Sequence, residues 1–250
     1  MLNEATLEQI KSLKLAGMAQ ALEQQLASPQ SQTLSFEERL GLLIEAEVND
    51  RTYKREIRLK SQAKLKHSGA YIESINYRTG RGLDKAKISS LALCQWVDDH
   101  QNLIITGPTG VGKTWLSCAF GMEVIRRGMP VIYMRVGRLL EEVAIARADG
   151  SLPKLRVKVA KCRLLILDDW GLSPLTDIGR QDLLEFIDDR LESGSVIIAS
   201  QLPIKAWYDY INEPTLADAI LDRIVHRAHK IEMHGESMRK KMAISKGDKA

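Results

Sequence analysis

Short apolar runs recur from about residue 91 onward, separated by stretches with helical spacing of apolar positions. The strand candidates are Leu103–Thr106, Val131–Met134, Leu164–Asp168, Ser195–Ala199 and Lys230–Met233. Runs that are apolar throughout, rather than alternating, are typical of strands covered by helices on both faces. The pattern therefore predicts an α/β fold, a three-layer domain with a five-stranded parallel sheet.

The first third of the chain has no such run and is predicted to be helical. Thr6 with Gln9, and Ser35 with Glu38, match the spacing of a capping box, in which two side chains satisfy free amides at a helix start. The segment 51–66 carries seven basic residues and one acid, and residues 69–90 resemble an irregular linker. We therefore expect a helical module at 1–68 that docks a partner or subunit, a linker at 69–90 and the α/β domain at 91–250.

One loop carries a specific chemical signature. Gly107-Pro108-Thr109-Gly110-Val111-Gly112-Lys113-Thr114 fits G-x-x-x-x-G-K-[ST] between a predicted strand and a predicted helix. Glycines let backbone amides turn toward an anion, and the helix N-terminus favours negative charge. Lys113 is then expected to reach the β- and γ-phosphates of ATP, and the Thr114 hydroxyl to bind Mg²⁺. This loop predicts a P-loop ATPase.

Two further predicted strands end in residues that suit phosphate chemistry. The run before Asp168 and Asp169 is the best candidate for the Walker B strand, with Asp168 on magnesium and Asp169 orienting or deprotonating the attacking water. Ser200 and Gln201 follow another strand, where a polar side chain could help to position that water. Trp96, just before the first strand, is a candidate for the adenine side.

Composition narrows the class of protein without deciding it. The formal net charge of +4 permits an acidic partner but does not require one. Cys94, Cys118 and Cys162 are widely separated, which argues against a disulfide scaffold or a zinc site. The N-terminus has no signal-peptide pattern and no apolar run is long enough to span a bilayer. We therefore expect a cytoplasmic protein that does not act at a membrane.

The order of the motifs separates the ATPase classes. A complete extra strand, Val131–Met134, lies between the P-loop and the Walker B strand. This order favours an AAA+ ATPase over a stand-alone kinase that phosphorylates a small molecule, a protein that would be monomeric and indifferent to DNA. No Arg-rich closing lid of the kinase type is evident.

Taken together, the motifs resemble the IstB transposition helper ATPases, relatives of the bacterial initiator and helicase-loader AAA+ proteins. Beyond the P-loop and Walker B regions, the resemblance includes Ala148–Gly150, Thr215–Arg223 and Gly235–Lys241. It implies a protein that assembles with ATP as a ring or filament on double-stranded DNA and cooperates with a transposase to select a target for a mobile element. The alternative within this fold is a DnaC-like replicative helicase loader, whose N-terminal module would bind a helicase.

The resemblance also assigns roles to two arginines, and the chain departs from the usual pattern at two points. Arg223 matches the arginine that acts on a neighbouring subunit's nucleotide, and Arg239 matches a second nucleotide-sensing arginine. Only residues 234–250 follow the last predicted strand, so the usual C-terminal helical lid is expected to be minimal or absent. Asp169 stands where many AAA+ proteins carry Glu, so we expect slow hydrolysis.

Three basic clusters compete for the DNA surface. The relatives place a helical insertion facing the DNA where Lys154, Arg156, Lys158 and Lys161 lie, so this cluster is the first choice. The others are the segment 51–66 and the C-terminal tail. Lysine and arginine on phosphates would give sequence-independent binding that weakens steeply with salt.

Overall fold

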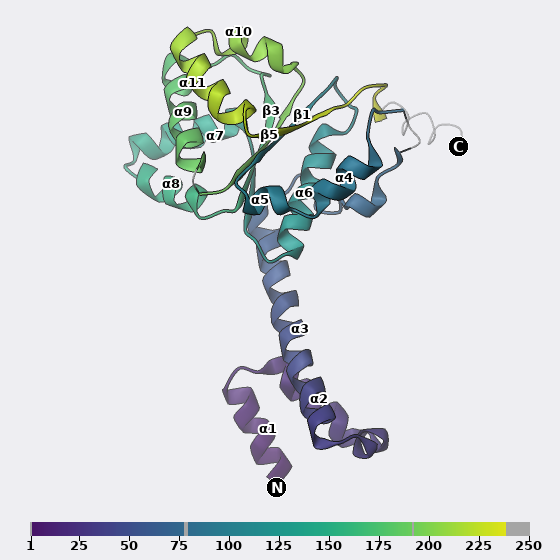
Figure 1. Cartoon of the computed structure of the whole chain (residues 1–250). Coiled ribbons are helices and arrows are strands. Elements are labelled where there is room, and N and C mark those ends of the chain that lie inside the picture. Colours follow the sequence, from purple (N-terminus) through teal and green to yellow (C-terminus); the bar gives the residue numbers. More distant parts are fainter. Residues whose placement is uncertain (1, 78–79, 192, 239–250) are drawn as a thin grey trace, which may run out of the picture. The chain divides into compact units, whose positions relative to one another are not determined.

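The chain forms two compact units, Met1–Arg58 and Leu59–Ala250. The computed structural model describes residues 2–77, 80–191 and 193–238 (Figure 1). The division falls earlier than the expected linker at 69–90, because that segment is folded into the second unit. Ala70, Ile75 and Ile88 are buried there, and Asp84 caps α4 (Lys85–Ala92) by accepting from two backbone amides.

The first unit is helical, as expected. It contains α1 (Leu2–Ser12), α2 (Ala16–Ala27), η1 (Pro29–Thr33) and most of α3 (Phe36–Ala63). The capping box before α3 is confirmed, because the Ser35 amide donates to Glu38 Oε2 at 2.8 Å and the Glu38 amide donates to Ser35 Oγ at 3.2 Å. The one expected at Thr6 is wrong, since Thr6 lies inside α1.

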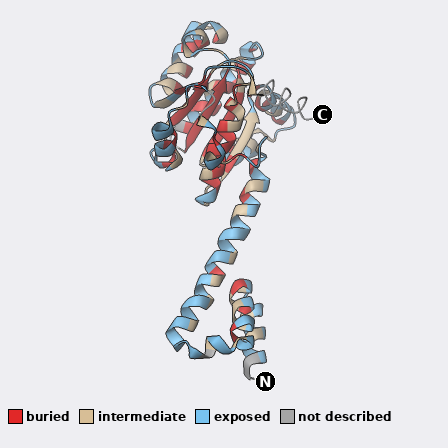
Figure 2. Cartoon of the chain, turned by 90° about the vertical axis from the view of Figure 1, so that its right-hand side faces the viewer, coloured by how far each residue is buried: buried red, intermediate tan, exposed pale blue. Residues whose placement is uncertain are grey.

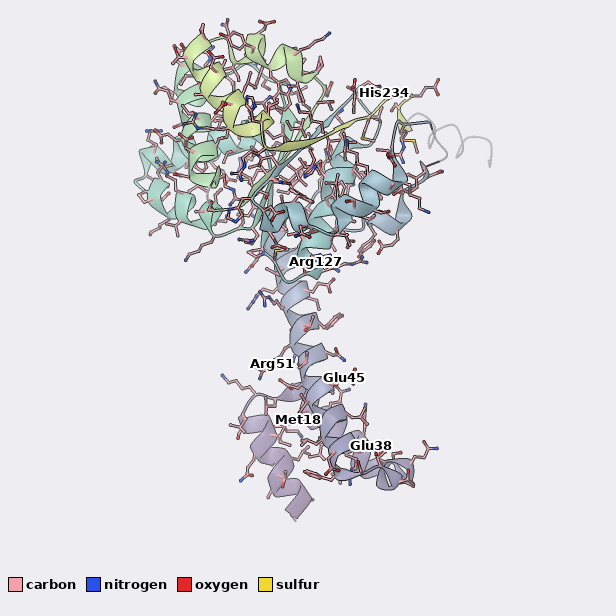
Figure 3. All side chains as sticks on the ribbon, viewed as in Figure 1. Met18, Glu38, Glu45, Arg51, Arg127 and His234 are labelled. Carbon is pink, nitrogen blue, oxygen red and sulfur yellow. The ribbon has the colours of Figure 1, made fainter. Side chains whose placement is uncertain are left out.

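Contact between α2 and α3 is close enough to exclude a side chain at Gly17. A Cβ at Gly17 would fall against the Ala46 carbonyl oxygen. At the next residue, the Met18 amide donates to Glu47 Oε2 at 3.1 Å, and Arg51 Nε lies 2.6 Å from the other oxygen of Glu47. Figure 3 labels Met18 and Arg51 among the side chains of this unit. Glu47 therefore joins the two helices through a buried carboxylate.

The second unit is built on one parallel sheet. Its strands are β1 (Asn102–Thr106), β2 (Val131–Arg135), β3 (Leu164–Trp170), β4 (Ser195–Ser200) and β5 (Ala228–Glu232), in the spatial order β2-β3-β4-β1-β5. Every pairing is parallel. The remaining elements are η2 (Ile72–Ser74), α4, α5 (Gln95–Asp98), α6 (Lys113–Arg126), α7 (Val136–Ala148), α8 (Leu152–Ala160), α9 (Asp177–Leu191), η4 (Ile204–Ala206), α10 (Trp207–Ile211) and α11 (Pro214–Val225). The predicted five-stranded parallel α/β sheet is confirmed.

Successive strand residues enter two separate cores, one on each face of the sheet. Ile105 and Ile166 pack with Phe120 of α6, whereas Ile104 and Leu165 pack with helices α7 to α11 on the other face. Figure 2 shows buried residues concentrated in this sheet and the helices against it. Burial on both faces explains why the strands are apolar throughout. The interior between two helical layers leaves the carboxyl ends of the strands as the place for a ligand.

The segment after β5 crosses the P-loop. The His234 amide donates to the Arg81 carbonyl at 3.0 Å, and the Met238 amide donates to the Gly110 carbonyl at 2.9 Å. Residues 239–250, which include Arg239 and the basic tail, lie outside the described residues. None of the helices in the described part of the chain combines the length and apolar character needed to cross a membrane.

Candidate nucleotide-binding site

The P-loop joins the end of β1 to the start of α6 through three glycines in left-handed conformations. The φ angles of Gly107, Gly110 and Gly112 are 146°, 84° and 104°. At Gly107 a Cβ would fall onto the Met233 carbonyl, and at Gly110 onto the Ser237 hydroxyl. Both the backbone angle and the lack of space therefore require glycine. The loop ends at the N-terminus of a 14-residue helix, a position that favours an anion.

Lys113 is folded over the loop that it follows. Its Nζ donates to the Gly107 carbonyl at 2.7 Å and to the Pro108 carbonyl at 2.9 Å. The side chain is buried, so its ammonium group is held at the mouth of the loop instead of extending into solvent. This position suits the predicted contact with the β- and γ-phosphates, which remains a prediction.

Thr114 and Asp168 come together from two different elements, α6 and β3. The Thr114 hydroxyl lies 2.9 Å and 3.1 Å from the two carboxylate oxygens of Asp168. Asp168 is only 1% exposed, and Tyr133 on β2 donates to its Oδ2 at 2.7 Å. A hydroxyl and a carboxylate are hard oxygen ligands, and Mg²⁺ commonly takes one or two protein ligands and fills the rest of its shell with phosphate and water. The pair therefore fits Mg²⁺.

Asp169 occupies an irregular point of β3. The register between β3 and β4 shifts between Leu167 and Trp170, and Asp169 has a φ of 59°. Such irregularities re-aim side chains next to active sites. The carboxylate of Asp169 lines the same cavity as Lys113, and its Oδ2 lies 3.3 Å from Arg135 Nε on β2. Asp169 thus lines the cavity and is paired with an arginine, and its contact with water remains a prediction.

The two polar residues at the end of β4 differ in their surroundings. Ser200 is fully buried; its hydroxyl donates to the Trp170 carbonyl at 2.8 Å and accepts from the Leu202 amide. The first bond connects β4 to β3, and the two bonds together leave the Ser200 hydroxyl unsuited to the water-positioning role suggested by its sequence position. Gln201 lines the cavity, and its Oε1 accepts a 2.7 Å hydrogen bond from the Thr109 hydroxyl.

A cavity of about 450 Å³ contains the P-loop residues, both aspartates and Gln201. Sequence reasoning missed one of its charged residues, Arg81, which is only 8% exposed. Its Nη1 donates to the Val111 carbonyl at 3.3 Å and its Nη2 to the Asn76 carbonyl at 2.9 Å. Burial lowers the pKa of this guanidinium from its ordinary value. Arg81 lies within the predicted linker, where the only sequence signal was the pair of glycines that flank it, Gly80 and Gly82.

The tryptophan beside the nucleotide cavity is not the expected one. Trp115, the residue after the P-loop, lines the cavity. Trp96 is buried in the core and its indole donates to the Leu91 carbonyl at 2.9 Å. The suggested placement of Trp96 on the adenine side is therefore wrong, because its polar edge is already satisfied by the backbone of α4.

Arg223 is separate from the residues of this cavity. It lies near the end of α11, forms an ion pair with Asp188 and donates to the Ala219 carbonyl at 2.9 Å. The described lining of the nucleotide cavity does not include it. The action of Arg223 on a neighbouring subunit's nucleotide, which the resemblance implies, remains a prediction.

The predicted DNA cluster on α8 is only partly available. Arg156 is held by α9, because its Nε lies 2.7 Å from Asp189 Oδ2 and its Nη1 lies 3.0 Å from Glu185 Oε2. Lys154, Lys158 and Lys161 are exposed. Arg156 consequently serves to fasten α8 to α9, and the lysines are the members of the cluster that a ligand could reach.

The strand order, the P-loop after β1, the acids at the end of β3 and the glutamine after β4 together define a P-loop ATPase of the AAA+ class. The chain belongs to the family of IstB-like ATP binding proteins, whose sequence profile matches residues 8–246. It therefore binds ATP, and it belongs among the ATPases associated with insertion sequences.

Individual relatives agree with this assignment. The insertion sequence ATP-binding protein y4pL of Sinorhizobium fredii is 46% identical over 241 residues, covering 96% of this chain and 98% of the relative. The IS1162 ATP-binding protein of Pseudomonas fluorescens is 50% identical over 203 residues, or 81% and 88% of the two chains. AMPPCP-bound DnaA from Aquifex aeolicus shares the fold, with a TM-score of 0.57, 18% identity and coverage of 72% of this chain and 55% of that one.

Proposed function

We propose that this chain is an ATP-dependent DNA-binding helper of a transposase, which assembles on double-stranded DNA and promotes insertion of a mobile element at the DNA it selects. The observation that carries the proposal is the convergence of Lys113, Thr114, Asp168 and Asp169 in one cavity. The family of insertion-sequence ATP-binding proteins supplies the context.

The chemistry follows from these side chains. Lys113 would neutralise charge on the β- and γ-phosphates, while Thr114 and Asp168 would hold Mg²⁺, which supplies further positive charge there. The oxygen of a water oriented by Asp169 and Gln201 attacks the γ-phosphorus, and Asp169 accepts its proton. The bond from that phosphorus to the β–γ bridging oxygen breaks, leaving ADP and phosphate. We expect slow turnover, because Asp169 is shorter than glutamate and is paired with Arg135. We also expect assembly to stimulate this turnover.

Assembly is supported by the position of Arg223. Its side chain is about one-third exposed, is oriented by Asp188, and is absent from the described lining of its own subunit's cavity. A guanidinium that enters a neighbour's site would place fixed positive charge against the transition-state phosphates. We therefore infer a homo-oligomer, a ring or a helical filament, in which ATP sites are completed between subunits.

Duplex DNA is the proposed ligand on which the subunits assemble. Lys154, Lys158 and Lys161 on or just after α8 offer exposed positive charge, as do several residues of α3. Some of the α3 charge is offset, because Arg51 pairs with Glu47 and Lys54 with Asp50. Phosphate contacts of this kind would bind DNA largely without regard to sequence.

The first unit is the proposed docking module for the transposase. It has its own helices and a dividing point at Arg58. Deletion of residues 1–58 is preferable to deletion through residue 66, because Leu59 and Ala63 belong to the core beside α6. Loss of transposase stimulation with retained ATP binding would support docking. Retained stimulation would show that the transposase docks elsewhere on the chain. The DnaC-like helicase-loader alternative would be favoured instead if the full chain stimulated no transposase and this unit bound a helicase.

The experiment that tests the proposal is imaging of the protein on a random-sequence duplex by negative-stain electron microscopy, with light scattering in parallel. We expect rings or filaments with ATP, and far fewer with ADP or without nucleotide. Lys113→Ala should abolish them. A monomer that ignores DNA under each condition would refute the proposal.

A further inference from the structure

The nucleotide cavity is lined by two groups of residues with different chemistry. The P-loop and the two aspartates form the part in which phosphates and Mg²⁺ are expected. A second group comes from the chain before β1, and its members are His67, Ser74, Ile75, Asn76 and Arg81. A purine base needs apolar surface for its faces and a few placed polar atoms for its edge. Buried Ile75 and partly buried Trp115, which also lines the cavity, supply the apolar surface, so the second group suits the base.

Arg81 connects this second group to the P-loop through its side chain. Its Nη2 donates to the Asn76 carbonyl at 2.9 Å, and its Nη1 donates to the Val111 carbonyl at 3.3 Å. Val111 lies between the last two glycines of the P-loop. A guanidinium presents its donors in a rigid planar fork, so contacts from two of its nitrogens fix two carbonyls relative to each other.

Close approaches on both sides hold Arg81 in this position. A Cβ at Gly112 would lie 3.1 Å from Arg81 Nη1, so the guanidinium lies directly against the P-loop. The Arg81 carbonyl accepts from the His234 amide at 3.0 Å, and a Cβ at Gly82 would fall against the His234 ring. Both the side chain and the backbone of Arg81 are therefore fixed by the chain around them.

The burial of Arg81 indicates a role beyond filling space. A buried charge is costly unless hydrogen bonds compensate it, and the side chain is only 8% exposed. Burial also lowers the pKa of the guanidinium from its ordinary value. An apolar side chain would occupy the same place without this cost. The arginine is explained if the two carbonyls that it holds have to be in defined positions.

The backbone beside Asn76 is suited to read the edge of a base. The amides of Ser74 and Ile75 are bonded within η2, to the Tyr71 and Ile72 carbonyls at 3.0 Å and 3.2 Å, so the turn that leads into Asn76 is fixed. Adenine presents an amino donor beside a ring acceptor, whereas guanine presents a carbonyl acceptor beside a ring donor. Polar groups that match one edge are left unpaired by the other, and this difference is a strong source of selectivity.

We propose that Arg81 is a positioning residue for base selection, which ties the Asn76 carbonyl to the Val111 carbonyl and so fixes the backbone that distinguishes adenine from guanine. Arg81 acts through this backbone, so its contribution falls on the base and not on the phosphates. Lys113, which is held at the mouth of the P-loop, acts on the phosphates of either nucleotide.

Isothermal titration calorimetry of the full chain with Mg²⁺ tests the proposal. The ligands are a non-hydrolysable ATP analogue, the matching GTP analogue and inorganic tripolyphosphate, which has no base. Wild type should prefer the ATP analogue. Arg81→Met should weaken binding of the ATP analogue about tenfold, while binding of the other two ligands changes little, so the preference for adenine falls by the same factor. Lys113→Ala should weaken binding of all three.

Arg127→Met is the matched control, because Arg127 is an exposed arginine at the other end of α6 (Figure 3). This variant should bind all three ligands as the wild type does. Arg81→Lys keeps the positive charge but lacks the planar fork, so it should resemble Arg81→Met. Thermal unfolding of each variant establishes that it is folded.

Three results would overturn the inference. They are a wild type without preference for adenine, a folded Arg81→Met with the wild-type preference, and a loss of tripolyphosphate binding in Arg81→Met as large as that of the ATP analogue. Full preference in Arg81→Lys would contradict the bridging role. Should Arg81→Met not fold, Asn76→Gly loosens the same backbone, and an unchanged preference in this variant would also overturn the inference. No DNA is present in these titrations, so their failure would leave the proposed function standing.

Discussion

Tyr133 donates a 2.7 Å hydrogen bond to Oδ2 of Asp168 from the neighbouring strand. The tyrosine is half-buried, and burial together with the adjacent carboxylate raises its pKa above the ordinary value. The hydroxyl therefore stays protonated and remains a donor at neutral pH. Thr114 contacts both oxygens of the same carboxylate, so Asp168 is held by two hydroxyl groups.

Tyr133→Phe should weaken the positioning of Asp168 without changing any residue of the P-loop. Loss of one hydrogen bond to a carboxylate costs about 1–2 kcal/mol, or roughly a fivefold to 30-fold effect. We expect the Mg²⁺ concentration that gives half-maximal ATP turnover to rise by this factor. The measurement is a magnesium titration of turnover, with exposed Tyr208→Phe as the control. An unchanged magnesium dependence would show that Tyr133 has no positioning role.

Gly110→Ala should abolish ATP binding. Its new Cβ would require a φ of 84° and would collide with the Ser237 side chain, so the loop and the segment across it must both shift. Gly137→Ala is a matched control, because no atom lies within 4 Å of its added Cβ and Gly137 is helical. That control should stabilise the fold by about 0.5–1 kcal/mol. A fluorescent ATP analogue and thermal unfolding measure the two effects, and retained binding in Gly110→Ala would contradict this account of the loop.

Mixing two inactive variants tests whether Arg223 acts between subunits. Arg223→Ala leaves its own acids intact, and Asp169→Asn leaves its own Arg223 intact. In a random equimolar mixture, about one site in four combines an intact acid with a neighbour's arginine, so turnover should recover to about a quarter of wild type. Turnover is measured on duplex DNA. A mixture no more active than either variant alone would exclude action in trans.

The first unit should lose stability in acid because of Glu47. The hydrogen bond from Arg51 is the main cause that lowers the pKa of Glu47 from its ordinary value of 4.5, aided by the Met18 amide. A depressed folded-state pKa stabilises the fold above the unfolded value, and this contribution disappears as the pH falls below 4.5 through the folded-state pKa.

Circular dichroism of thermal unfolding at pH 7 and at pH 3.5 measures this contribution. Glu47→Gln should lower the stability of the first unit at pH 7 and should differ less from wild type at pH 3.5. Exposed Glu45→Gln, on the same helix, is the control for a general charge effect. Equal destabilisation by Glu47→Gln at both pH values would argue against the ionic contribution.

The fold could be predicted from the sequence because the signals for its strands and for the P-loop are local. Apolar runs place all five strands to within a few residues, and the P-loop marks the junction of β1 and α6. Helix starts were less certain, since the capping spacing at Thr6 lies inside a helix while that at Ser35 begins one. Spacing alone does not reveal which of two matching pairs has free amides to cap.

Several site residues could not be predicted from the sequence, because the order of the strands in the sheet creates their contacts. Tyr133 and Arg135 reach the aspartates only because β2 pairs with β3, about 30 residues later in the chain. Arg81 contacts the P-loop through a hydrogen bond to the Val111 carbonyl, 30 residues later in the chain. Conversely, Arg156 looked like a DNA contact until α9 placed Asp189 beside it. A charge pattern shows where arginines are, but tertiary structure decides which are already paired.

The central claim is that bound ATP controls attachment to DNA, and binding of a labelled random-sequence duplex measured by fluorescence anisotropy tests it most directly. The titration compares wild type and Lys113→Ala with a non-hydrolysable ATP analogue, with ADP and without nucleotide, at two salt concentrations. We predict wild-type binding that is at least about tenfold tighter with the analogue, a difference of about 1.4 kcal/mol, that weakens with salt and is lost in Lys113→Ala. DNA affinity that is the same with every nucleotide, in both proteins, would contradict the account.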